Sequence, residues 1–174
     1  GKSTESQKAT RKNFKLASKL ACSLRKAAHA DDAWRKHVKK HQSLYNTIFS
    51  NAYNMARGNK VSERAYIYPD FKHSLDSNSV RLKDGRITAS LNTDDFSDFD
   101  GKKPVYAQMA VVVYCKEPLN DEIPENYFIN LNSKEVLISK EGTFDFSINL
   151  NESSDSEECL SELELLTLSS YENH

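Results

Sequence analysis

The chain has 174 residues, 38% hydrophobic and 28% charged, which is enough for one domain with a sizeable core. Its longest apolar run, residues 109–115, is far shorter than the roughly 20 residues of a membrane-spanning helix, so a membrane span is excluded. The five glycines stand far apart, which excludes the glycine-rich loops that bind nucleotide phosphates. The Lys-rich N-terminal segment also lacks the apolar stretch of a secretory signal.

The net charge of −1 conceals a strong asymmetry along the chain. Residues 1–60 contain 14 Lys and Arg against 3 Asp and Glu, whereas residues 61–174 contain 10 against 22. Such an asymmetry predicts that the basic part contacts an anionic partner, or the acidic part of the same or a neighbouring chain.

The three cysteines, Cys22, Cys115 and Cys159, form no C-x-x-C pair. Their odd number and their spacing indicate neither a disulfide framework nor a thiolate zinc site. We therefore expect a reducing, cytoplasmic location, and we expect no metal or cofactor.

Residues 1–58 are expected to form a basic helical hairpin. From Ser3 to about Ala28, small and large apolar residues share one helical face and lysines line the other, with Ser3 or Thr4 as N-cap. A second helix is expected from Asp31 or Asp32 to Gly58. Its apolar stripe consists of Trp34, Val38, His41, Tyr45, Ile48, Ala52 and Ala56. Because the connection is short, the two helices should be antiparallel.

Residues 61–150 show strand periodicity and predict an antiparallel β domain. The expected strands are residues 64–68, 79–82, 86–91, 105–114, 127–131, 135–139 and 143–150. Asp84-Gly85 predicts a hairpin turn, and the segment 105–114 is apolar on both faces, as in a central strand. The predicted fold is α+β, with the helical hairpin followed by a mostly antiparallel sheet of about six strands.

Residues 151–174 form an acidic tail that contains leucines and has no Lys or Arg. Its first part, 151–158, is typical of a flexible linker. The run that follows contains too many leucines to remain in solvent, so we expect it to dock on the fold as a short helix or a last strand.

The strongest candidate site is a cationic tip on the hairpin. Its residues are Arg25 and Lys26 from the first helix and Arg35, Lys36, Lys39 and Lys40 from the second. Clustered Lys and Arg bind phosphate backbones by releasing counterions. No zinc-finger spacing or RNA-recognition aromatic motif accompanies them, so backbone contacts are expected rather than base readout.

This pattern favours a non-enzymatic binding or assembly protein that engages a nucleic acid backbone or an acidic protein surface. A simpler interpretation is a solvated face that keeps the hairpin soluble. A third is self-association as a homo-oligomer, with the basic part of one chain against the acidic part of another.

The alternative enzymatic interpretation is a metal-dependent nuclease. Tyr68-Pro69-Asp70 and Asp100-Gly101-Lys102 superficially resemble the PD-(D/E)xK arrangement, in which carboxylates hold Mg²⁺ and a lysine positions water. Here Asp100 and Lys102 lie in an expected loop rather than on a strand, so we rank an enzyme below a binding protein.

Three weaker patterns have simpler structural interpretations. His37 and His41 have the spacing of a helical zinc site but lack its glutamate. The acidic loop with Asp94, Asp95, Asp98 and Asp100 does not fit an EF-hand. Asp70, His73 and Ser74 are adjacent in sequence, which seldom produces a catalytic triad.

Overall fold

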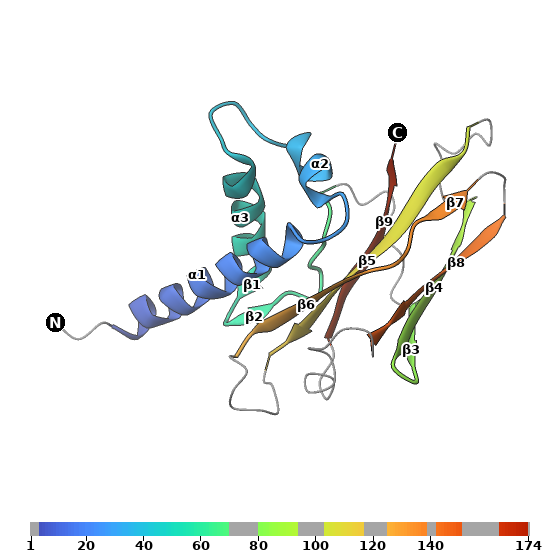
Figure 1. Ribbon diagram of the computed structural model, residues 1–174. Coiled ribbons are helices and arrows are strands. Elements are labelled where there is room, and N and C mark those ends of the chain that lie inside the picture. The colour runs from blue at the N-terminus through green and yellow to red at the C-terminus, as the bar shows by residue number, and fades with distance from the viewer. Residues whose placement is uncertain are drawn as a thin grey trace.

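The computed structural model describes residues 4–69, 80–93, 103–116, 125–138, 142–150 and 164–173, the last of these as backbone only. The helices are α1 (Glu5–Leu24), α2 (Ala30–Arg35) and α3 (Leu44–Met55) (Figure 1). The strands are β1 (Ala56–Arg57), β2 (Lys60–Val61), β3 (Val80–Lys83), β4 (Arg86–Asn92), β5 (Val105–Cys115), β6 (Tyr127–Asn132), β7 (Val136–Ile138), β8 (Thr143–Asn149) and β9 (Glu164–Asn173). The α+β class is confirmed.

The strands form three sheets rather than the single sheet of about six strands that we expected. Their orders are β1-β2, β3-β4-β8 and β6-β5-β7, with β9 also paired to β5. Every pairing among the described strands is antiparallel. β6 pairs with the second half of β5 and β7 with its first half.

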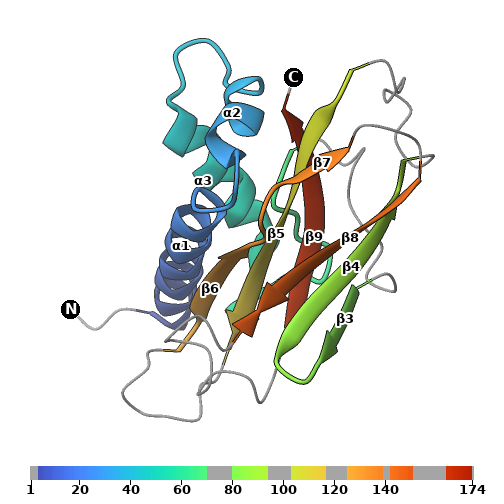
Figure 2. The ribbon, with the colours of Figure 1, turned by 45° about the vertical axis from the view of Figure 1, so that its right-hand side comes forward.

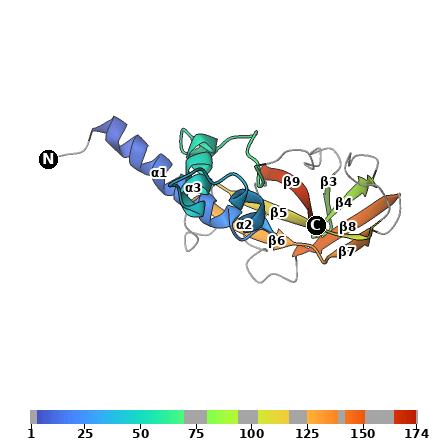
Figure 3. The same ribbon diagram turned by 90° about the horizontal axis from the view of Figure 1, so that it is seen from above.

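Strand β5 is buried on both faces, as its sequence predicted. Ala110, Val112 and Tyr114 join the core that the helices cover. The alternate residues, among them Met109 and Val111, pack in a second core against the β3-β4-β8 sheet. The structure therefore has a helical layer, a central sheet and a second sheet (Figure 2). Seen from above, the helices lie at one end and β3, β4 and β8 at the other (Figure 3).

Helix α1 begins with a capping box. The Thr4 side chain accepts from the Gln7 backbone N–H, and the Gln7 side chain accepts from the Thr4 N–H. One face of the helix, with Leu16, Leu20 and Leu24, is buried against α3 and the central sheet. The first expected helix is thus confirmed, although it ends at Leu24 rather than near Ala28.

The second expected helix is interrupted. It is divided into α2 and α3, and His41 in the intervening segment has a left-handed backbone with φ 68°. The like-charge pairs that a continuous helix would place at i, i+4, such as Arg35 with Lys39, do not by themselves end a helix, because α1 contains pairs such as Arg11 with Lys15 at the same spacing. Ser43 instead caps a new helix by accepting from the Asn46 N–H at 3.1 Å.

The segment 64–68 is a buried connection and not the expected strand. It is held by side chains: the Trp34 indole N–H donates to the Ile67 carbonyl at 2.9 Å, and the Tyr68 hydroxyl donates to the Ala28 carbonyl. The segment belongs to none of the described sheets. A small hairpin, β1-β2, precedes it, and Gly58 lies in the turn with φ 62°.

Asparagines on β6 attach the helical layer to the central sheet. The Asn130 amide donates to the Ser23 carbonyl and accepts from the Ser23 hydroxyl, each at 2.7 Å. The Asn132 side chain accepts from the Ala28 N–H at 2.9 Å. Carbonyls in the last turn of a helix have no partner within the helix, so Asn130 stabilises the end of α1, and Asn132 holds the turn that follows it.

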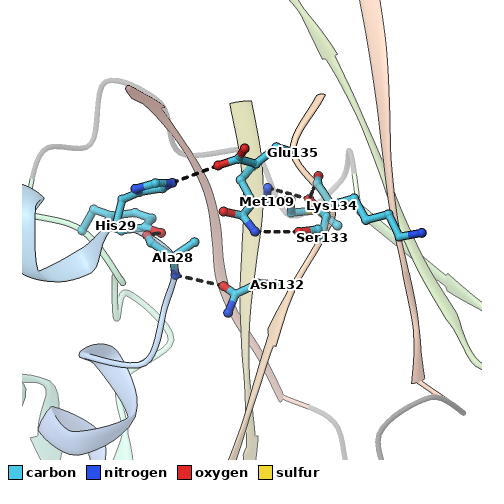
Figure 4. A network of polar contacts seen from close by, with 9 residues as sticks. Ala28, His29, Met109, Asn132, Ser133, Lys134 and Glu135 are labelled. Carbon is cyan, nitrogen blue, oxygen red and sulfur yellow. Dashed lines mark hydrogen bonds and ion pairs between the residues drawn. The ribbon is translucent and has the colours of Figure 1, made fainter. Parts of the chain in front are cut away.

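Next to these asparagines, the break between β6 and β7 is also held by polar groups (Figure 4). The Ser133 hydroxyl accepts from the Met109 N–H at 2.9 Å and bridges the interruption. Nearby, the His29 imidazole faces the Glu135 carboxylate at 3.7 Å, a further contact between the helical layer and the sheet.

The C-terminal tail contributes a strand, one of the two conformations expected for it. β9 pairs with β5 from Tyr106 to Tyr114, with a bulge between Ala110 and Val112. With β6 and β7 along its other side, β5 is the central strand of its sheet, as predicted.

Asn130→Ala is expected to lower the free energy of unfolding by about 1–3 kcal/mol, because it leaves the buried Ser23 hydroxyl without its acceptor. Chemical denaturation followed by circular dichroism measures the change. Asn132→Ala, at an exposed position, should cost less. Equal stabilities of Asn130→Ala and the unmodified protein would contradict this role.

Candidate functional site

The six residues predicted for the cationic tip lie around α2. Arg25 follows α1, Lys26 lies in the next turn, and Arg35 ends α2. Lys36, Lys39 and Lys40 lie on the interrupted segment before α3. All six are exposed. The interruption means that Lys39 and Lys40 are presented by a loop and not by the predicted hairpin helix.

Arg25 is already paired within the molecule. Its guanidinium donates to both carboxylate oxygens of Asp31, at 3.0 and 2.9 Å. The hydrogen bond from Arg25 holds the pKa of Asp31 below its usual value, and the charge of Arg35 acts in the same direction. The same pair raises the pKa of Arg25. Arg25 therefore contributes less free positive charge than the sequence predicted.

The segment 35–41, here called the cationic loop, carries the densest exposed charge of the predicted site. Its exposed residues are Arg35, Lys36, His37, Lys39, Lys40 and His41, and only Val38 is partly covered. The loop stands at one end of the helical layer, between α2 and α3 (Figures 1 and 2). Lys39 and His37 also line a pocket of about 380 Å³ with Trp34 and Tyr66.

A second basic cluster was not singled out as a site from the sequence. Lys12, Lys15 and Lys19 on α1 line a groove of about 290 Å³ together with Asn59 and Asn126. Lys19 donates to the Glu125 and Asn126 carbonyls at 2.7 and 3.3 Å. Burial lowers the pKa of Lys19, as does the charge of Lys15, while Glu125 raises it. In the sequence, the spacing of these lysines by three and four residues was the signal that could have identified this cluster.

Few of the basic side chains are neutralised within the described part of the chain. The ion pairs there join Lys8 to Glu5, Arg25 to Asp31, and His29 to Glu135. Lys26, Lys39 and Lys40 make no ion pair with a described residue. Toward the described part of the chain, these three side chains keep their positive charge unpaired.

The residues of the alternative sites lie mostly outside the described residues. This holds for Asp70, Asp100 and Lys102 of the nuclease hypothesis, for Asp94, Asp95 and Asp98 of the acidic loop, and for His73 and Ser74. His37 and His41 are described, but the interruption of the helix removes the helical i, i+4 geometry of a zinc pair. In the described ranges, no three His, Cys, Asp or Glu side chains form a metal-binding group.

No helix in the described ranges combines the length and the apolar character needed to cross a membrane. Comparison of the chain with protein-family models, with curated proteins and with solved structures gave no match. The function of this chain is therefore inferred from its own surface chemistry.

Asp31→Asn is expected to destabilise the protein at neutral pH by up to about 1 kcal/mol, the range for an exposed ion pair. Because the pKa of Asp31 is lowered in the folded state, its contribution is present above the ordinary value of about 4 and is lost as the pH falls through the folded value. Thermal melts of both proteins from pH 7 to pH 2 should converge at low pH. A difference that is constant across this range would contradict an ionic contribution.

Proposed function

We propose that this protein binds nucleic acid without catalysis, by contacts to backbone phosphates from the cationic loop and Lys26. The observation that carries the proposal is the loop itself, where six of the seven residues 35–41 are exposed Arg, Lys or His. Such a surface neutralises phosphates and releases counterions, a contribution that is independent of base sequence.

The composition of the cationic loop favours nucleic acid over an acidic protein surface. Protein–protein interfaces generally bury an apolar centre within a polar rim. The exposed large hydrophobic residues of the described chain are Phe14, Tyr53, Leu82, Tyr106 and Leu137, and none of them lies in the loop. A surface of charge without an apolar centre is better suited to a phosphate backbone.

The groove that Lys12, Lys15 and Lys19 line on α1, here called the lysine groove, extends the proposed contact area. Lys15 and Lys19 repel each other there, since the charge of Lys15 lowers the pKa of Lys19. A bound phosphate would replace this repulsion by attraction to both ammonium groups. A reducing, cytoplasmic location is part of the proposal, because Cys22 is an exposed free thiol.

Binding of a labelled 20-base-pair DNA of arbitrary sequence, followed by fluorescence anisotropy, tests the proposal. Affinity should fall steeply between about 50 and 200 mM salt. Lys39→Glu with Lys40→Glu should weaken binding at least about tenfold at low salt and reduce the slope of log K against log salt by about 2. Arg81→Glu with Lys83→Glu is the matched control, since it makes the same charge change on exposed positions of β3.

Equal losses from the two double variants would indicate a general effect of net charge and would contradict a binding loop. Absence of DNA binding at 50 mM salt would overturn the proposal. Polyglutamate should bind more weakly than DNA, and the reverse order would indicate an acidic protein partner. Light scattering at low and high salt tests the homo-oligomer, which should dissociate as salt rises.

A further inference from the structure

Four aromatic rings form a continuous stripe on the outer side of the helical layer. Tyr45, Phe49 and Tyr53 recur every four residues on α3, and Phe14 reaches them from α1. Ring centroids are separated by 4.9 Å for Phe14–Phe49, 6.0 Å for Tyr45–Phe49 and 6.2 Å for Phe49–Tyr53. The four residues, here called the aromatic stripe, thus make one contiguous surface.

The stripe is open to solvent at two of its rings. Phe14 is 56% exposed and Tyr53 is 38% exposed, whereas Leu16 and Leu20 on the same helix as Phe14 are fully buried. The Tyr45 hydroxyl lies 3.3 Å from the Ser18 hydroxyl, which fixes one end of the stripe. Phe14 therefore adds little to the core, and more than half of its surface is open to solvent.

Positive charge borders these rings. Arg11 precedes Phe14 by three residues on α1, so the two side chains are neighbours on the helix surface. Lys15 follows Arg11 by four residues and extends the charge toward the lysine groove. Both are exposed, and neither makes an ion pair with a described residue.

We propose that the aromatic stripe stacks the bases of single-stranded nucleic acid while Arg11 and Lys15 contact its phosphates. This inference rests on the proposed function and adds the class of nucleic acid to it. Exposed rings beside cations suit a single nucleic acid strand, in which the base faces and the phosphates are both accessible. Base–aromatic stacking does not require a particular base sequence. A duplex keeps its base faces stacked on each other and offers only phosphates and groove edges.

The test compares two labelled 15-mers of equal charge by fluorescence anisotropy: oligothymidylate, and an abasic oligomer with the same sugar–phosphate backbone. The unmodified protein should bind oligothymidylate about tenfold or more tightly than the abasic oligomer. Phe14→Ala with Tyr53→Ala should remove this preference and leave abasic binding unchanged. Tyr106→Ala with Leu137→Ala is the matched control, since it removes two exposed hydrophobic residues from β5 and β7.

Phe14→Leu with Tyr53→Leu keeps apolar bulk without a ring, so it should also lose the preference while circular dichroism remains that of the folded protein. Equal binding of both oligomers by the unmodified protein would overturn the stacking role and leave backbone binding intact. Binding of neither oligomer at 50 mM salt would overturn the proposed function as well. A change in oligomeric state with unchanged preference in the alanine variant would assign the stripe to a protein contact instead.

Discussion

The fold depends on a strand that is apolar on both faces. β5 packs against the helices with one set of alternating residues and against the β3-β4-β8 sheet with the other. Burial of apolar surface is the main favourable term in folding. Because β5 buries apolar side chains on both of its faces, it belongs to both cores and links them. The helical layer, the tail strand β9 and the second sheet all take their positions from it.

Apolar contact alone does not orient the helical layer, and the polar groups of β6 supply that constraint. Asn130 and Asn132 contact the end of α1 and the turn after it, and Lys19 donates to carbonyls just before β6. Hydrogen bonds require defined distances and angles, whereas apolar packing is non-directional. They thereby fix which side of α1 faces outward, and this is the side that carries Arg11, Lys15 and Phe14.

The sequence predicted the parts of the fold that depend on local periodicity. The first helix, the double burial of β5 and the turn at Asp84-Gly85 all follow from patterns within one segment. The division of the strands into separate sheets and the pairing of β9 with β5 depend on contacts between distant segments, which periodicity does not encode. The interruption after Arg35 was not predictable either, because the apolar stripe of the second expected helix continues through it.

The candidate surface was predictable in composition but not in arrangement. The basic residues of the predicted tip are exposed, yet the Arg25–Asp31 pair depends on the turn between α1 and α2, which the sequence did not define. Phe14 falls within the apolar arc of the first expected helix and is nevertheless exposed, because a helical arc does not show how far the neighbouring elements extend. The four-residue spacing of Tyr45, Phe49 and Tyr53 was visible in the sequence, but only the structure joins it to Phe14.

The cationic loop stands apart from both cores, which suits it to the proposed role in binding. Its side chains lie on an irregular segment between α2 and α3, where His41 has a left-handed backbone and Ser43 begins a new helix. The cores do not depend on this segment, since its only partly covered side chain between Lys36 and His41 is Val38. A phosphate backbone would lower the repulsion within the loop without disturbing either core. Binding at this position therefore requires no rearrangement of the fold around β5.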